Sequence, residues 1–312
     1  MKRLCLLYLC LCVLLCGCAT DTPVSPEENG PAASAGDTGT APGSPSSTAP
    51  SGMDGAFVLS FIHIGKADSF LLTLPDGGHY LLDTGKASDF GLIARLLESR
   101  GIETLDGIFL SHGHKDHAGS LEKLVTLYPT AVLYLSALDT VTYQAIDARG
   151  IAAAHGVRVE ELAAGDRLSL GGGPDPLQID VLAPLSLDPD KENNNSLVLR
   201  LTYGDTVFLM MGDAEKAVEK DLLQAGIPLQ ADVLKLGHHG KDDATTEEFL
   251  AQVQPTYALI TGNAQDDPDT VNAEIADRLA AYRVQPYYSD GTWLSLDFVT
   301  DGHTLSVQPY EP

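Results

Sequence analysis

One short segment, residues 111–117, holds the residue types that are most able to do chemistry, and it reads Ser-His-Gly-His-Lys-Asp-His. Neutral imidazole binds Zn, Fe, Mn or Ni, and a carboxylate adds affinity for harder ions. The alternating spacing allows His112 and His114 to face one metal ion while Asp116 and His117 serve a second. A solvated polar loop is the alternative interpretation, but this density of imidazoles favours a metal site.

The elements around this segment predict a mixed α/β domain. Before it, strand-like stretches cover residues 56–64, 69–74 and 79–82, and a helix capped by Ser88 is expected to stop at Gly101. The segment itself lies between an apolar strand (107–110) and a helical stretch (121–128). The second half has strands near 177–182, 197–202, 207–211, 232–236 and 258–261, and helices near 214–225, after a capping box at 245–248, and near 271–282. This pattern indicates two sheets that face each other with helices outside.

The composition suits a packed globular protein of 312 residues, with 44% hydrophobic and 20% charged residues. The formal net charge is -24, which argues against non-specific nucleic-acid binding, since such binding depends on basic residues that neutralise phosphates. Nucleic acid is therefore disfavoured as a partner unless bound cations hold it locally, and a small or neutral substrate molecule is favoured. All cysteines lie in the first eighteen residues, so the rest of the chain has neither disulfides nor thiolate metal sites.

The N-terminal segment is expected to direct export. A basic start, Lys2-Arg3, precedes a short apolar run, and residues 15–18 (Leu-Cys-Gly-Cys) resemble a bacterial lipobox in which Cys18 is lipidated. An ordinary cleaved signal peptide is the alternative. Residues 1–18 are thus predicted to be a lipoprotein signal peptide, 19–55 a disordered linker rich in Pro, Ser, Thr and Gly, and 56–312 the folded domain. The chain is expected on the outer face of the bacterial cell membrane, held by its lipid anchor only.

The histidine-rich segment resembles the His-x-His-x-Asp-His motif of the metallo-β-lactamase fold superfamily. Other motifs of that superfamily also have counterparts here, in the same order along the chain. Residues 81–85 (Leu-Leu-Asp-Thr-Gly) resemble the strand whose aspartate, here Asp83, supports the loop. Residues 210–215 resemble the strand end whose aspartate, here Asp213, bridges two metals, and residues 234–240 resemble the late-histidine segment. The resemblance implies a four-layer αββα sandwich and a dinuclear site.

The sequences of these motifs are similar to those in the C-terminal domain of the ComEC competence proteins. The similarity is clearest in residues 192–200, 212–215 and 238–240. The chain departs from that branch in several places. In the superfamily a further histidine is usual between the histidine loop and Asp213. Here that interval has only His155, which is expected to be exposed. The Asn193–Asn195 run occupies the stretch in which that histidine would lie. The motif Asp-Val-Gly-Gln-Gly-Asp, usual in that branch, is replaced by His-Ile-Gly-Lys-Ala-Asp at residues 63–68. At residues 267–268 this chain has Asp-Pro where His-Pro is common.

Either His238 or His239 can be the late ligand, because adjacent residues leaving a strand point in opposite directions. Resemblance to related phosphocholine esterases favours His239 as the ligand, which leaves His238 to face the substrate. Lys66, Lys86, Lys115 and Lys241 lie beside the motif loops and could form a positive rim, although ordinary solvated lysines are an equal alternative.

The resulting hypothesis is an exported, membrane-tethered metallo-hydrolase that acts on phosphate esters, in the manner of a phosphodiesterase, nuclease or phosphocholine esterase. The alternatives are a hydrolase of lactone, thioester or β-lactam substrates, and a low-turnover DNA- or envelope-binding protein of the competence type. Two divalent ions are expected, Zn²⁺ first and Mn²⁺ or Fe as alternatives, and they would lower the pKa of water toward neutrality. The oligomeric state is left open. The assigned roles are metal binding for His112, His114, Asp116, His117, Asp213 and His239, catalysis for Asp116 and His238, support for Asp68, Asp83 and Asn195, and substrate binding for Lys66 and Lys241.

Overall fold

The computed structural model describes residues 55–138, 145–173, 175–291 and 293–312. The predicted signal segment with Cys18 and nearly all of the predicted linker lie outside these described residues. Within the described ranges, no helix has the length and apolar character that crossing a membrane requires.

Strands from both ends of the described chain form the first sheet. In the described residues it has eight strands in the order β15-β14-β1-β2-β3-β4-β5-β6, with β3 to β6 parallel and the other pairs antiparallel. The strands are β1 (Phe57–Ile62), β2 (Phe70–Thr73), β3 (His79–Leu82), β4 (Gly107–Phe109), β5 (Val132–Ser136), β6 (Arg158–Leu162), β14 (Ser295–Thr300) and β15 (Leu305–Tyr310).

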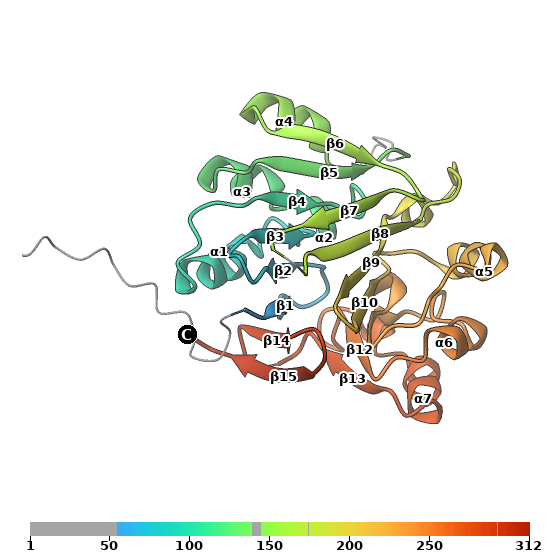
Figure 1. Ribbon diagram of the computed structural model, residues 1–312. Coiled ribbons are helices and arrows are strands. Elements are labelled where there is room, and N and C mark those ends of the chain that lie inside the picture. Colours follow the sequence, from blue (N-terminus) through green and yellow to red (C-terminus); the bar gives the residue numbers. More distant parts are fainter. Residues whose placement is uncertain (1–54, 139–144, 174, 292) are drawn as a thin grey trace, which may run out of the picture. The chain divides into compact units, whose positions relative to one another are not determined.

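The second sheet faces the first (Figure 1). As far as the structure describes the chain, it has seven strands in the order β13-β12-β11-β10-β9-β8-β7, of which β10 to β13 run parallel. The strands are β7 (Arg167–Leu170), β8 (Leu177–Ala183), β9 (Val198–Tyr203), β10 (Thr206–Met210), β11 (Val233–Lys235), β12 (Tyr257–Ile260) and β13 (Gln285–Tyr288).

Alternation of side chains along the strands produces the layers. In β1, Phe57, Leu59 and Phe61 belong to the core between the sheets, together with Phe208 and Met210 from β10. The neighbouring positions point the other way, because successive side chains of a strand face opposite sides. Both faces of these central strands are therefore buried, which is why they read as continuous apolar runs.

Helices cover the outer face of each sheet. The first sheet packs against α1 (Phe90–Ser99), α3 (Leu121–Leu127) and α4 (Ala148–His155), and the second against α5 (Lys216–Ala225), α6 (Glu247–Val253) and α7 (Ala273–Ala281). Figure 1 shows the two groups of helices on opposite sides of the paired sheets. The predicted four-layer αββα fold is confirmed.

Two predicted helix starts differ from the structure in their capping residues. The N-cap of α1 is Asp89 rather than Ser88, whose hydroxyl donates to the Asp89 carboxylate. At α6 the N-cap is Thr246, whose Oγ accepts from Phe249 N. The predicted capping box at 245–248 is wrong, because the carboxylate that accepts from the backbone N–H groups of Thr245 and Thr246 belongs to Glu219 in α5. A tertiary contact thus replaces the local one.

Candidate metal centre

The candidate centre forms where the carboxyl ends of strands from both sheets meet. Asp83 follows β3 and the histidine loop (residues 111–117) follows β4, while Asp213 follows β10 and the two late histidines follow β11. Parallel neighbours bring their carboxyl ends to the same edge of a sheet, so each sheet delivers two loops to one side. The predicted site segments are therefore brought together by strand pairing.

Asp83 holds the histidine loop. Its carboxylate accepts from Ser111 N at 2.7 Å and from Ser111 Oγ at 2.8 Å, and lies 2.8 Å from His117 Nδ1. The Asp83 backbone has a φ of 59°, a left-handed conformation that aspartate tolerates better than most residues. Such strained positions persist where surrounding contacts over-determine them, and here those contacts fix the loop.

His117 and His239 approach Asp213 from opposite sheets. His117 Nδ1 is anchored on Asp83, so its Nε2 faces Asp213 Oδ1 at 3.2 Å. His239 Nδ1 lies 2.9 Å from Thr261 Oγ1 and 3.2 Å from Asp68 Oδ1, so its Nε2 faces Asp213 Oδ2 at 3.3 Å. In both rings an outer partner fixes one nitrogen and leaves the other for the interior, which is the usual arrangement of a metal-binding histidine.

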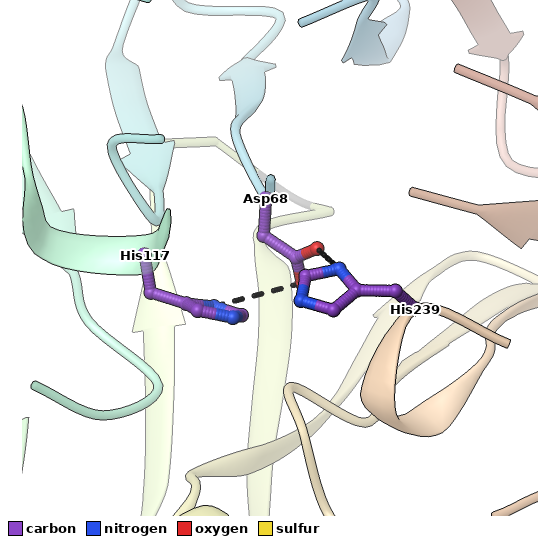
Figure 2. Close-up of side chains that lie close together, drawn as sticks. All are labelled: Asp68, His117 and His239. Atoms are coloured by element: carbon purple, nitrogen blue, oxygen red, sulfur yellow. Dashed lines mark ion pairs between the residues drawn. The ribbon is translucent and has the colours of Figure 1, made fainter. Parts of the chain in front are cut away.

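Asp68 lies between these two rings, as Figure 2 shows. Its Oδ2 is 3.8 Å from His117 Nδ1 and 2.5 Å from the ammonium of Lys235. Asp68, His117 and His239 have the composition of a metal site, but Lys235 already supplies the cation for Asp68. Asp68 is thus placed as an outer partner of the histidines.

Asp116 completes a set that we call the inner group: Asp116, His117, Asp213 and His239. Asp116 lies on α2 (Lys115–Ala118), and its Oδ2 is 3.6 Å from His239 Nε2. The side chains of His117 and His239 are fully buried, that of Asp213 is 3% exposed and that of Asp116 is 14% exposed. These four residues converge on one interior point from both sheets.

His112 and His114, which we call the outer pair, lie beside the inner group. His112 Nε2 is 3.0 Å from His114 Nδ1 and 4.0 Å from Asp213 Oδ2. The other nitrogen of His112 faces the hydroxyls of Ser111 and Ser196, and His114 Nε2 is 3.3 Å from Glu192 Oε2. Asp213 is therefore within reach of both the inner group and the outer pair.

The donor set fits divalent metal. Among the described residues, His117 Nε2, His239 Nε2 and Asp213 Oδ1 are buried and have no hydrogen-bond partner, although they face one another. Buried polar atoms without partners are costly, and imidazole nitrogens facing a carboxylate are the ligands that transition metals prefer. The residues of this site therefore fit the divalent ions that the fold implies.

The electrostatics of the inner group also favour a bound cation. Burial opposes charge on His117, yet the carboxylates of Asp213, Asp68 and Asp83 raise its pKa well above the usual value. Burial also opposes charge on His239, but the negative charge of Asp213 and the neighbouring carboxylates, which accept hydrogen bonds from the ring, raise its pKa to about 9. For Asp213 burial is likewise outweighed by the two histidines, which hold its pKa well below the usual range. The carboxylates thus stabilise positive charge at this point.

His238 and His239 have opposite environments. Both have left-handed backbones, with φ of 43° and 58°, and this turn directs only His239 into the interior. His238 is partly exposed, with Nδ1 2.9 and 3.0 Å from the carboxylate oxygens of Asp243 and Nε2 3.4 Å from Asn193 Nδ2. His239 therefore belongs to the inner group, and His238 faces the open side.

Sequence reasoning missed Lys235 and Glu192. Lys235 lies in an otherwise apolar strand with 1% of its side chain exposed, and it donates to the Gly212 carbonyl as well as pairing with Asp68. A lysine between Leu234 and Leu236 is itself a signal, because an unpaired lysine is almost never fully buried. Glu192 opens the asparagine-rich phrase, but only the tertiary structure brings it to His114.

Two of the four lysines that were expected to form a positive rim, Lys66 and Lys241, are paired with carboxylates. Lys66 Nζ donates to Asp116 Oδ2 at 2.9 Å, and Lys241 Nζ lies 3.2 Å from Asp267 Oδ2. Both side chains remain about one-fifth exposed, at 20% and 23%. Their positive charge is thus largely balanced, although both ammonium groups remain at the edge of the centre.

The remaining predicted residues take structural positions. Asn195, in the 3₁₀ turn Glu192–Asn195, accepts from Asp188 N at 2.8 Å and donates to the Asp188 carbonyl at 2.9 Å, so it stabilises its own loop. His155 is exposed at the C-terminal end of α4, as expected, and does not join the imidazole cluster.

Binding of Zn²⁺ is expected to release protons. Because the pKa of His239 is raised to about 9, this imidazole carries a proton near neutral pH that must leave before a metal binds. Zn²⁺ affinity should therefore fall as the pH is lowered from about 9 to about 7, by up to about tenfold per pH unit for each displaced proton. Calorimetry in two buffers of different protonation enthalpy measures this; identical heats in both buffers would contradict it.

Comparison with known proteins agrees with this geometry. A family model described as the Metallo-beta-lactamase superfamily matches residues 64–261. ComE operon protein 3 of Bacillus subtilis (strain 168) is 33% identical over 222 residues, which cover 65% of this chain and 28% of that protein. Recombination protein 2 of Haemophilus influenzae is 27% identical over 217 residues, 68% of this chain and 25% of that protein. The chain thus spans about a quarter of the length of these curated relatives.

A solved structure shares the fold at low sequence identity. CmlA, a diiron beta-hydroxylase from Streptomyces venezuelae, superposes with a TM-score of 0.53 at 13% identity, over 78% of this chain and 54% of CmlA. The family match covers strands β2 to β6 of the first sheet and β7 to β12 of the second, together with the histidine loop, Asp213 and His239. The chain belongs to the metallo-beta-lactamase superfamily.

Proposed function

We propose that this protein is a metal-dependent hydrolase with a dinuclear site that acts on phosphate esters. The observation that carries the proposal is the inner group, in which buried atoms of His117, His239 and Asp213 face one another without hydrogen-bond partners. Positive charge, from bound metal ions or from protons on the two rings, stabilises such an arrangement.

The residues would divide into two sets of ligands. Asp116, His117 and His239 would hold one ion, His112 and His114 the other, and Asp213 would lie between them. When bound, two divalent ions would supply Lewis acidity and water of lowered pKa. Zn²⁺ is the first candidate because imidazoles dominate the set, with Mn²⁺ and Fe as alternatives.

The chain's own residues would orient the substrate from the open side. His238 is partly exposed and held by Asp243, so its Nε2 can hydrogen-bond to a substrate oxygen. In this proposal Asp116 is both a metal ligand and a catalytic residue. Its carboxylate lies beside His239 and pairs with the ammonium of Lys66. A hydrogen-bonded, preorganised set of this kind stabilises charge that develops on a reacting oxygen.

Two features support phosphate esters over carboxylic substrates. One relative named above is called Recombination protein 2, and recombination acts on DNA, whose backbone is a phosphodiester. Lys66 and Lys241 also place ammonium groups beside the centre, although each already has a carboxylate partner. The net charge of -24 disfavours a long nucleic acid and favours small phosphodiesters.

A substrate panel tests the proposal. The purified protein, loaded with Zn²⁺ or Mn²⁺, should hydrolyse chromogenic phosphodiesters, lose this activity with a chelator and regain it when metal is returned. Faster turnover of lactones, thioesters or β-lactams would instead favour the alternative hydrolase. Full metal content without turnover of any of these would favour a binding protein of the competence type.

Loss of the rim lysines should affect substrate binding more than chemistry. We expect Lys241→Ala to raise the KM for a phosphodiester by about 3- to 10-fold with little change in kcat, because a partly exposed charge contributes about 1 kcal/mol. Lys220→Ala, a change on α5 away from the centre, is the control. Unchanged KM and kcat in Lys241→Ala would remove this residue from the substrate site.

We also propose that the protein is exported and anchored through Cys18 on the outer face of the cell membrane. The proposal depends on the lipobox-like residues 15–18 and on the polar linker that follows. Cell fractionation and mass spectrometry of the mature N-terminus test it. Cys18→Ser should shift the protein from the membrane fraction, and an unmodified Cys18 would contradict the proposal.

A further inference from the structure

We propose that a hollow on the outer face of the second sheet binds a small aliphatic anion, a molecule with an alkyl chain and a carboxylate or phosphate head. The hollow has a volume of about 590 Å³, within the range of about 300–1,000 Å³ that is usual for ligand cavities. Its lining comes from β7, β8, β9 and the segments beside them, and it includes no residue of the inner group or the outer pair. The inference is therefore independent of the proposed hydrolase activity.

Alternation along the strands places two charged residues in this hollow. In β9, Arg200 lies between Leu199 and Leu201, which both belong to the core between the sheets. Successive side chains of a strand face opposite sides, so Arg200 points to the outer face. Asp180 of β8 is the cross-strand partner of Arg200 and points to the same face. In Figure 1, β7, β8 and β9 lie at one end of the second sheet.

Arg200 retains donor capacity for a ligand. Its Nη1 donates to Thr202 Oγ1 at 2.8 Å, but it is 3.9 Å from Asp180 Oδ2, which is beyond hydrogen-bond distance. Arg200 Nε is buried and has no hydrogen-bond partner in the described part of the chain, while 21% of the side chain remains exposed. A guanidinium has five N–H donors, so this one is incompletely satisfied by the protein.

The carboxylates of the lining already have other partners. Asp180 accepts from Nε of Arg167 through Oδ1, and Asp166 accepts from Ala163 N at 2.8 Å within its own turn. Arg200 is therefore the charged group that we expect to select the head of the ligand. Carboxylate and phosphate both match the planar fork of an arginine, whereas a cation or a neutral head would not.

The walls of the hollow fit an alkyl chain. Leu182, Leu185, Ile227 and Pro228 line it, and Leu185 is 45% exposed, so a chain lying here would cover apolar surface that now faces water. Among the described residues that form the lining, none is aromatic, so a nucleobase or another planar ring would find no surface on which to stack. The chemistry of the hollow thus favours an aliphatic anion over a nucleotide.

Calorimetric titration of the purified, metal-loaded protein with decanoate, below the concentration at which it self-associates, tests the proposal. We expect saturable binding of one molecule per chain, weakened about 2- to 4-fold by each methylene removed from the ligand. Decanol, which has the same chain without the charge, should bind at least about 10-fold more weakly. Decyl phosphate distinguishes the two heads, since the tighter of decanoate and decyl phosphate identifies the anion that the site prefers.

Two variants with matched controls locate the site. Arg200→Gln should weaken decanoate binding by at least about 10-fold, whereas Arg95→Gln, on a 51% exposed arginine that pairs with Glu311, should not change it. Leu185→Ala should weaken binding by about 3-fold, whereas Leu127→Ala, on a 62% exposed leucine of α3, should not. Leu185 is exposed, so its variant also tests the site if Arg200→Gln folds poorly.

Equal affinity for decanol and decanoate, or unchanged decanoate binding in folded Arg200→Gln, would overturn the proposal. Decanoate held at the metal centre would give this second result, because Arg200 lies outside that centre. Absence of saturable binding would overturn the proposal as well. Failure of the proposed function is a separate result, since absence of phosphodiester turnover leaves decanoate binding and its dependence on Arg200 unchanged.

Discussion

Asp213→Asn is expected to reduce phosphodiester hydrolysis by at least about 1000-fold, which corresponds to about 4 kcal/mol of lost transition-state stabilisation. The reason is the central position of Asp213, whose carboxylate oxygens lie 3.2 Å from His117 Nε2, 3.3 Å from His239 Nε2 and 4.0 Å from His112 Nε2. Asparagine keeps the shape but removes the charge that both ions would share. Initial rates and metal content, measured on the same preparation, test the prediction.

Asp205→Asn is the matched control. Asp205 is 82% exposed and pairs with His303 on the surface, so the same change of charge there should leave metal content and rate unaltered. Folding is checked by urea unfolding of both variants. A folded Asp213→Asn protein with two metals and wild-type rates would contradict the bridging role.

Lys235→Met is expected to destabilise the protein by about 3–5 kcal/mol. Lys235 and Asp68 are almost completely buried, with 1% and 2% of their side chains exposed, and form an ion pair. Methionine fills the space of the lysine stem but removes the ammonium partner of Asp68, so only His117 and His239 remain to offset the burial of its charge. The pKa of Asp68 lies well below its usual value, since Lys235 and the two histidines outweigh burial, so the group remains ionised at neutral pH.

Urea unfolding of the metal-free protein measures the effect. Lys123→Met, a change at an exposed position of α3, should shift the unfolding free energy by less than about 0.5 kcal/mol. Adding Asp68→Asn to Lys235→Met should recover part of the lost stability, because it removes the unpaired charge. Equal stability of Lys235→Met and the wild type would show that the buried pair does not stabilise the fold.

Much of the fold was predictable because local patterns and tertiary packing agree. The nearly continuous apolar runs of β1 and β10 are buried on both faces, as such runs indicate. Helix α5 ends at Ala225 before Gly226, which has a left-handed φ of 65°, as its position after the helix predicts. The start of α6 was predicted less well, since Glu219 from another helix supplies the capping carboxylate.

The residue types of the centre could also be predicted, because the histidine loop, Asp213 and the two late histidines each follow a recognisable strand. The choice between His238 and His239 was left open by the residues themselves, and only the resemblance favoured His239 as the one that turns inward. The turn after β11 places both residues in left-handed conformations, and this geometry depends on packing against Thr261, Asp68 and Asp243. Residues that are adjacent in sequence thus acquire opposite environments through contacts with distant ones.

The amino-acid sequence by itself determined the fold class, the order of the motifs and the ligand chemistry, because strand periodicity and imidazole spacing are local properties. The tertiary structure alone decided which atoms of those residues face one another. It paired Lys235 with Asp68 and Glu192 with His114. It also gave Lys66 and Lys241 carboxylate partners that offset their charge. Such pairs join segments far apart in the chain, so their distances depend on how the two sheets pack and on no local pattern.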